Sequence, residues 1–357
     1  MKIIHTSDLH LKSPLTSRLS PEKAVMRARE LEESFARLCE AAMKLSCDAV
    51  IIAGDLFDTA MVGVKALDTI FTVIRRYPCI KYLYLPGNHE GDVIARTGLP
   101  LPENLFLFGK EWTYFDFGDL RIAGRCENKR NMMSTLDASG KKNIAVLHGE
   151  LRDYGGTDDT FGIKDLERTP VDYYALGHYH SYSAKQLAGG GSAVYCGTPE
   201  GRGFDEVGEC GFVLLDTSGI GISHKFIRFA KRMQIICPVD ISKAKTNAHV
   251  ESLITSALSS YGRENLIRIQ LCGERDPALK LNTDVIKSRF KGHFFYFEIK
   301  DKTKLKIDMN ALRFDKSLKG EFLRLCLNDV SLSDEERQMI IDCGLAALSG
   351  ESYEVTE

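Results

Sequence analysis

The stretch Ala49-Val50-Ile51-Ile52-Ala53-Gly54-Asp55 decides the fold, because its apolar residues form an unbroken run that ends at a glycine and an acid. Such a run is typical of a short strand that is buried on both faces. Further strands are predicted at 2–6 and 80–85, and helices are predicted over 21–45 and 64–76. Strand, helix, strand, helix and strand in this order imply a parallel sheet.

The pattern changes after about residue 104, where short strands and turns follow one another. Strands are predicted near 112–117, 120–125, 143–148, 172–176, 193–196, 211–216 and 222–229. This half of the chain is expected to contain more antiparallel pairs. The predicted fold class is therefore α/β, with two sheets packed face to face between flanking helices in a four-layer sandwich.

A new series of strands and helices begins after Arg228 and ends in a helical tail over about 309–348. We therefore place a domain boundary near residue 230. Residues 1–230 are predicted to form the larger α/β domain, and residues 231–357 a smaller α+β domain that caps it. The tail is amphipathic, so it is expected either to cover a core or to bind a partner.

The composition is that of an ordinary globular protein, with 357 residues, 44% hydrophobic and 27% charged. A net charge of -2 excludes a protein whose bulk charge drives nucleic-acid binding, but it does not exclude a local basic face. The ten cysteines are scattered and form no Cys-x-x-Cys pair. With no signal-like start and no apolar run of roughly 20 residues, these features predict a cytoplasmic protein with reduced thiols and no membrane segment.

Five short polar segments stand out because each follows a predicted strand. They are Asp8-Leu9-His10, Gly54-Asp55, Gly87-Asn88-His89-Glu90, Leu147-His148-Gly149 and Gly177-His178-Tyr179-His180. In open α/β sheets, ligands collect at the carboxyl ends of the strands. Carboxylate, amide and imidazole groups suit Mn²⁺, Fe²⁺, Zn²⁺ or Mg²⁺, and the neighbouring glycines permit close backbone approach. These segments therefore predict a metal site.

Taken in this order, the five segments resemble the motifs of the calcineurin-like metallophosphoesterases. Within that family, the stretches 5–11 and 54–59 are most similar to those of the SbcD-type nuclease subunits of the double-strand-break repair complex. The family's protein phosphatases carry Asp-Arg-Gly soon after Gly-Asp, whereas this chain has Phe57-Asp58-Thr59. The resemblance covers about residues 1–230 and implies the metallophosphoesterase fold for that domain.

The resemblance also implies two divalent cations, expected to be Mn²⁺, with Fe²⁺, Zn²⁺ or Mg²⁺ as alternatives. Their ligands form two sets that share one aspartate. One set is Asp8, His10, Asp55 and His180, and the other is Asp55, Asn88, His148 and His178. Two such cations polarise phosphoryl oxygens and activate a water. His89 is left over, and we expect it to be the catalytic residue that stabilises or protonates the leaving oxygen.

These features lead to three functional hypotheses. The first is a two-metal-dependent DNA nuclease of DNA repair, an exonuclease or also an endonuclease, for which the resemblance implies a homodimer and an SMC-like ATPase partner. The second is a phosphodiesterase that acts on a small or cyclic nucleotide. The third is a non-catalytic scaffold of the same fold, which would be expected to have lost ligands that this sequence keeps.

Other polar residues are candidates for supporting roles. Gly201 and Arg202 lie in a glycine-rich stretch that could hold a DNA phosphate, or that could be a tight loop with an exposed arginine. Glu90 and Asp58 are candidate acceptors that orient a histidine. Basic residues crowd between positions 287 and 306, which predicts either a DNA-guiding face or a solvated surface.

Overall fold

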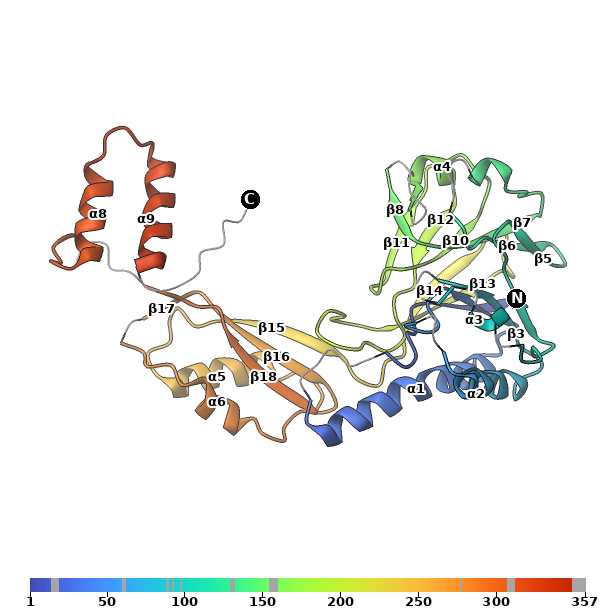
Figure 1. Ribbon diagram of the computed structural model, residues 1–357, viewed down its shortest axis with the longest axis horizontal. Coiled ribbons are helices and arrows are strands. Elements are labelled where there is room, and N and C mark those ends of the chain that lie inside the picture. Colours follow the sequence, from blue (N-terminus) through green and yellow to red (C-terminus); the bar gives the residue numbers. More distant parts are fainter. Residues whose placement is uncertain are drawn as a thin grey trace. The chain divides into compact units, whose positions relative to one another are not determined.

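The computed structural model describes residues 1–13, 19–59, 62–87, 90–91, 93–96, 98–128, 132–153, 160–276, 278–306 and 312–348 (Figure 1). The chain forms two compact units. The first contains Met1–Cys237, Leu258–Ile269 and Lys287–Ile299, and the second contains Pro238–Ala257, Gln270–Ile286 and Lys300–Glu357. The boundary placed near residue 230 stays a prediction.

The first sheet of the first unit is built from the strands at the start of the chain. Its order is β14-β13-β1-β2-β3-β4, in which β1 to β4 are parallel and the pairs β1–β13 and β13–β14 are antiparallel. The strands are β1 (Lys2–Thr6), β2 (Ala49–Ala53), β3 (Lys81–Leu85), β4 (Leu105–Leu107), β13 (Gly211–Asp216) and β14 (Ser223–Arg228). Helices α1 (Pro21–Lys44) and α2 (Val64–Arg75) form the crossovers, and α3 (Val93–Arg96) precedes β4. The predicted parallel sheet is confirmed.

Helix α1 begins where the sequence predicts, with Pro21 in its first turn. Proline is tolerated there because the amide hydrogen that it lacks would have no partner within the helix. The side chains of Leu31, Phe35, Leu38 and Ala42 follow helical spacing and are all buried. This stripe attaches α1 to the sheet.

The alternation of side chains along β2 gives the two faces of the first sheet different neighbours. Val50 and Ile52 belong to one buried cluster with Phe35 of α1 and Phe71 of α2. Ile51, which lies between them, belongs to a second cluster that includes residues of the second sheet. Because successive strand residues point to opposite faces, one short strand contributes to both cores.

The second sheet has the order β11-β12-β10-β7-β6-β5. Its strands are β5 (Thr113–Phe117), β6 (Leu120–Gly124), β7 (Lys142–His148), β10 (Tyr173–Gly177), β11 (Ser183–Gln186) and β12 (Ser192–Tyr195). The four central strands are parallel, and only the edge pairs β5–β6 and β11–β12 are antiparallel. The expectation that this half of the chain contains more antiparallel pairs is therefore confirmed, since all the antiparallel pairs of the two sheets involve its strands, although the centre of the second sheet is parallel. Within the described residues, the helices of the crossovers are the short η1 (Met132–Thr135) and α4 (Ile163–Glu167), which leave little trace in the sequence.

These short helices cover the outer face of the second sheet. Met132 of η1 and Leu166 of α4 share a buried cluster with Leu147 of β7 and Leu176 of β10. A small parallel pair, β8 (Glu150–Arg152) with β9 (Thr160–Gly162), lies in the same crossover as α4. Helices, sheet, sheet and helices thus form the predicted four layers.

The remaining elements follow β14 in the chain. A three-stranded sheet has the order β15-β16-β18 and consists of β15 (Gln234–Asp240), β16 (Leu266–Cys272) and β18 (Tyr296–Asp301). The other elements are α5 (Asn247–Ala257), β17 (Glu274–Arg275), α6 (Thr283–Arg289), β19 (Lys304–Leu305), α8 (Leu318–Asn328) and α9 (Asp334–Leu348). Helices α8 and α9 pack through Leu323, Cys326, Ile341 and Leu345. Among the described residues, no helix combines the length and apolarity needed to cross a membrane.

The buried histidine of β1 should make the stability of the fold depend on pH. His5 is fully buried, with Nδ1 2.9 Å from the hydroxyl of Tyr173. Burial lowers the pKa of His5 from 6.5 to about 3. Below pH 6.5 the unfolded chain therefore binds a proton that the folded chain refuses, and stability falls by about 1.4 kcal/mol per pH unit from this group.

We expect the wild-type protein to lose about 2 kcal/mol more than His5→Gln when the pH falls from 7 to 5. Urea unfolding with a chelator present, carried out at several pH values, measures this difference. Equal slopes for the two proteins would show that His5 is not the group responsible.

Candidate metal centre

Four of the predicted ligands adopt a backbone conformation that side chains normally avoid. Asp8, His10, Asp55 and His178 have φ angles of 52°, 45°, 51° and 107°, respectively. In the described part of the chain, only two other non-glycine residues have positive φ. Such conformations cost on the order of 1–3 kcal/mol each and persist where the surroundings impose them, which is common at functional sites. The strain is therefore concentrated on the predicted site.

Backbone hydrogen bonds hold the segments after β1 and β2 together. The amide of Asp8 donates to the carbonyl of Gly54 at 3.0 Å, and the amide of His10 donates to the carbonyl of Asp55 at 3.0 Å. A third bond follows from Leu11 to Leu56. Because β1 and β2 are parallel neighbours, their carboxyl ends lie side by side, and these bonds continue the pairing past the strands.

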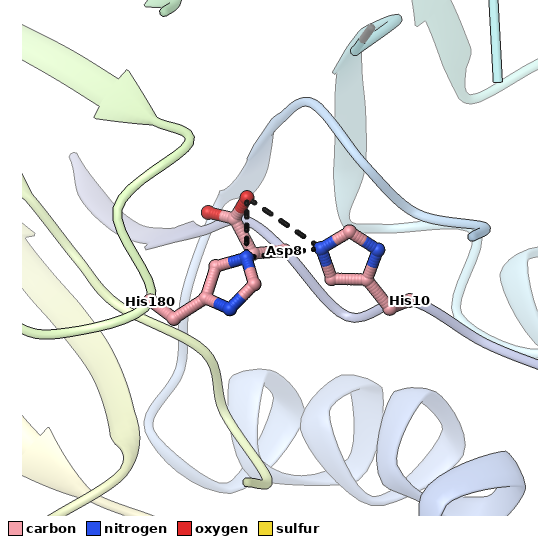
Figure 2. A group of neighbouring side chains, drawn as sticks. All are labelled: Asp8, His10 and His180. Atoms are coloured by element: carbon pink, nitrogen blue, oxygen red, sulfur yellow. Dashed lines mark hydrogen bonds and ion pairs between the residues drawn. The ribbon is translucent and has the colours of Figure 1, made fainter. Parts of the chain in front are cut away.

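Asp8, His10 and His180 form the first cluster of candidate ligands (Figure 2). The Nε2 atoms of the two histidines lie 3.1 Å apart. They lie 3.9 Å (His10) and 3.8 Å (His180) from the same Asp8 oxygen, Oδ1. Two ligands that are each about 2.1 Å from one ion and about 90–110° apart are separated by about 3.0–3.4 Å. The cluster therefore has nearly the spacing that a single bound cation requires.

Asp8, Asp55 and His148 form the second cluster, which adjoins the first. Asp55 Oδ2 lies 3.3 Å from His148 Nε2 and 3.8 Å from His10 Nε2, so this carboxylate reaches both clusters. The ring of His178 meets the ring of His148 edge-on at 5.5 Å between centroids. Its backbone amide donates to both oxygens of Asp8, at 3.0 and 3.1 Å. The structure thus brings together six of the seven predicted ligands.

Asn88 and His89, the remaining ligand and the predicted catalytic residue, lie outside the described residues. Their neighbours on each side are described. Gly87 follows β3 and packs so closely against Asp55 that a Cβ atom there would overlap the carboxylate. The segment that carries Asn88 therefore follows directly on a residue in contact with the site.

Glu90 connects this segment to the loop after β2. Its buried carboxylate accepts hydrogen bonds from the amides of Leu56 at 3.0 Å, Phe57 at 2.7 Å and Gly87 at 3.3 Å. Burial raises the pKa of Glu90 to about 7. The expectation that Glu90 orients a histidine stays a prediction, and the hydrogen bonds described for Glu90 come from backbone amides. Glu90 holds two ligand-bearing loops against each other.

The electrostatics of the site suit a cation. Asp8 and Asp55 are two buried carboxylates that lie within 4 Å of histidine nitrogens in the described part of the chain. Burial alone would lower the pKa of His148, but its hydrogen bond to Asp55 and the charges of both aspartates outweigh burial and raise the pKa to about 9. A proton on His148 therefore compensates part of the negative charge of Asp8 and Asp55. A bound dication would compensate this charge in its place. Burial, together with the charge of Arg202, lowers the pKa of His10 to about 4, which leaves this ring neutral and able to ligate.

In three of the candidate ligand histidines, Nε2 lies in a cluster and the second ring nitrogen, Nδ1, contacts an oxygen atom. Nδ1 of His148 is 2.9 Å from the Ala53 carbonyl, Nδ1 of His10 is 3.0 Å from Asp58, and Nδ1 of His180 is 2.7 Å from Glu206. Such contacts fix the tautomer and aim Nε2 toward the ligand position. Asp58 was predicted for this role. Glu206 was not, because an acid in a loop 26 residues after His180 carries no local signal.

The glycine-rich stretch predicted to hold phosphate lies against the same site. Gly201 is buried, and its carbonyl accepts hydrogen bonds from Arg27 and from Gln234. Arg202 is largely buried and contacts Glu206 and Asp58. Phosphate contact by Gly201 and Arg202 stays a prediction, and the structure gives both residues protein partners.

A four-layer α/β sandwich with adjoining Asp–His clusters at the carboxyl ends of its central strands defines a metallohydrolase. The sequence profile described as calcineurin-like phosphoesterase matches residues 1–182. The chain belongs to this family, whose members hydrolyse phosphoesters with divalent metal ions. The predicted fold and the resemblance are thereby confirmed.

Three relatives illustrate the range of similar proteins. An uncharacterized metallophosphoesterase, YhaO of Bacillus subtilis, is 30% identical over 76% of this chain and 72% of its own length. The DNA double-strand break repair protein Mre11 of Sulfurisphaera tokodaii is 24% identical over 96% of this chain and 92% of its own. A subunit of the nuclease SbcCD of Escherichia coli is 28% identical over 62% of this chain and 66% of its own.

Proposed function

We propose that this protein is a two-metal-dependent DNA nuclease that hydrolyses phosphodiester bonds with a metal-activated water and acts in DNA repair. The observation that carries the proposal is the convergence of Asp8, Asp55 and three histidines into two adjoining clusters. The similarity to a DNA double-strand break repair protein over 96% of this chain supports DNA as the substrate. Exonuclease activity is the expected form, with endonuclease activity as a variant of the same chemistry.

The side chains of this site would hold the two cations in two sets that share Asp55. We assign Asp8, His10, Asp55 and His180 to the first cation, and Asp55, Asn88, His148 and His178 to the second. The position of Asp55 Oδ2 between His10 and His148 supports the shared role. When bound, two dications would polarise phosphoryl oxygens and lower the pKa of a water, so that this water loses a proton more easily and can attack phosphorus. The oxygen and imidazole donors suit Mn²⁺, our first choice, as well as Fe²⁺, Zn²⁺ or Mg²⁺.

The chain's own residues orient the ligands and move the proton. The amide of His178 donates to Asp8, which fixes the direction in which that carboxylate presents its oxygens. We assign His89 to the leaving oxygen, where a protonated imidazole would donate its proton as the bond to phosphorus breaks. Its position directly after the ligand Asn88 and between two residues packed on the site supports this role.

We further propose a cytoplasmic homodimer that works with an SMC-like ATPase partner. The support is the similarity to a nuclease named as part of a larger assembly. Light scattering on the purified protein tests the dimer, since the dimer should have twice the 39.9 kDa of the chain.

A cleavage assay with Mn²⁺ tests the proposed substrate. Single- and double-stranded DNA, a cyclic nucleotide and a small synthetic phosphodiester are incubated with the wild-type protein and with His89→Ala. We expect Mn²⁺-dependent cleavage of DNA, and a loss of about 10²–10⁴-fold in kcat for His89→Ala with Mn²⁺ binding unchanged. Cleavage of the cyclic nucleotide without DNA cleavage would replace the nuclease by a small-nucleotide phosphodiesterase. No hydrolysis of any substrate with any of the four metals would indicate a scaffold.

A further inference from the structure

The guanidinium of Arg202 lies between two carboxylates at the edge of the metal centre. Its Nε and Nη2 atoms donate to Glu206 Oε1 at 2.8 and 2.7 Å. Its Nη1 atom donates to Asp58 Oδ1 at 3.1 Å and to the hydroxyl of Ser13 at 3.1 Å. Arginine suits this position because its planar group carries five donors in a fixed geometry.

Each of these carboxylates also contacts one candidate metal ligand. Glu206 Oε1 is 2.7 Å from Nδ1 of His180, and Asp58 Oδ1 is 3.0 Å from Nδ1 of His10. The opposite ring nitrogens, both Nε2, are 3.1 Å apart on the side of Asp8. One continuous chain of polar contacts therefore runs from His10 through Asp58, Arg202 and Glu206 to His180.

The loop that carries Arg202 and Glu206 is fixed at a buried position. The side chain of Glu206 is 4% exposed and that of Arg202 is 16% exposed. Just before them, Glu200 is buried and pairs with Arg27 at 2.8 Å and with Arg37 at 2.5 Å. A loop held by buried ion pairs cannot turn Arg202 outward without leaving charges unpaired, which is costly.

Glu206 is surrounded by hydrogen-bond donors. Its Oε1 atom accepts from Nε and Nη2 of Arg202 and contacts Nδ1 of His180, and its Oε2 atom accepts from the backbone amide of Arg202 at 2.6 Å. When Nδ1 of His180 donates to Glu206, the Nε2 atom of the neutral ring is the nitrogen that can bind a cation.

We propose that Glu206 and Arg202 are positioning residues of the metal centre: Glu206 orients His180, and Arg202 joins Glu206 to Asp58 so that His180 and His10 are held as one unit. This inference rests on the proposed function, because it concerns how the centre holds its first cation. It assigns Arg202 a role different from phosphate contact. A positioning role makes Arg202 control metal affinity, whereas phosphate contact makes it control substrate affinity.

Two substitutions separate these roles, and a third serves as a matched control. Glu206→Gln keeps the size of the side chain but removes the charge that His180 and Arg202 contact. Arg202→Lys keeps the positive charge, so electrostatic repulsion of a cation is unchanged, but a single ammonium cannot bridge both carboxylates as the guanidinium does. Asp205→Asn removes an exposed carboxylate immediately beside Glu206 and should have no effect.

Calorimetric titration of the metal-free proteins with Mn²⁺ gives the affinity and the number of ions bound. Of the two Mn²⁺ sites, we expect the one that is affected more to lose about 10–100-fold in Mn²⁺ affinity in Glu206→Gln and about tenfold in Arg202→Lys. The KM for a small phosphodiester at saturating Mn²⁺ should be unchanged in Arg202→Lys, while kcat falls. Thermal unfolding of the metal-free proteins checks that the variants fold. If Glu206→Gln does not fold, the Mn²⁺ affinity and the KM of Arg202→Lys test the inference.

Unchanged Mn²⁺ affinity in both variants would overturn the inference and leave the proposed function intact. A raised KM with unchanged Mn²⁺ affinity in Arg202→Lys would also overturn it, in favour of phosphate contact. Absence of Mn²⁺ binding by the wild-type protein would contradict the proposed function itself. Weaker Mn²⁺ binding in both variants, with Asp205→Asn like the wild type, supports the inference.

Discussion

Replacing Asp55 with asparagine should reduce metal-dependent phosphodiester hydrolysis on the order of 10³-fold or more. The reason is its position: one Asp55 oxygen lies 3.3 Å from His148 and 3.8 Å from His10, so its charge serves both clusters. Asparagine has nearly the same shape as aspartate and tolerates a positive φ, which is 51° at this position. The variant should therefore fold while losing the shared ligand.

Initial rates with a small phosphodiester and with DNA, at several Mn²⁺ concentrations, measure this loss. Asp68→Asn on the exposed face of α2 is the matched control, and it should behave like the wild type. Retention of more than a tenth of the wild-type rate in Asp55→Asn would refute a shared role for this carboxylate.

Gly177→Ala should destabilise the protein by about 3 kcal/mol or more. Gly177 ends β10 of the second sheet, and a Cβ atom there would overlap the carbonyl oxygen of Ala53, at the end of β2 in the first sheet. It would also come within 2.8 Å of the His148 ring and 2.9 Å of the Ser7 side chain. A backbone oxygen inside a strand cannot move aside, so the two sheets would have to separate at the site.

Urea unfolding of the metal-free variant measures this cost without any contribution from bound cations. Gly221→Ala provides the control, since a Cβ atom at that position meets nothing within 4 Å. Its stability should stay within about 0.5 kcal/mol of the wild type. If Gly177→Ala were as stable as this control, the close contact between the two strand ends would not exist in solution.

The first sheet and most of the site could be predicted from the sequence because local patterns determine them. The apolar run 49–53 is typical of a buried strand, and polar residues that follow neighbouring parallel strands lie at one edge of the sheet. The segments around Asp8 and Asp55 therefore come together for a reason visible in the chain itself, whereas those around His148 and His178 were included because of the order of the motifs and the family resemblance. Ligand roles for these residues nevertheless stay predictions until a metal is bound and measured.

Features that depend on distant contacts could not be predicted in this way. The parallel centre of the second sheet was not predicted because the helices described in its crossovers are only four and five residues long. Glu206 was missed because nothing near it in sequence distinguishes it from the exposed Asp205 beside it. Arg202 was interpreted through the glycines around it, whereas its partners Asp58 and Glu206 are brought to it by folding.

The most direct test of the two-metal centre is the number of Mn²⁺ ions that the purified chain binds at equilibrium. Metal analysis after dialysis, combined with calorimetric titration, gives this number for the wild type and for Asp55→Asn. The two proposed ligand sets, which share Asp55, predict two ions per chain in the wild type and weakened binding of both in the variant. A wild-type protein that binds no Mn²⁺, Fe²⁺, Zn²⁺ or Mg²⁺ under these conditions would contradict the two-metal centre and the hydrolysis derived from it.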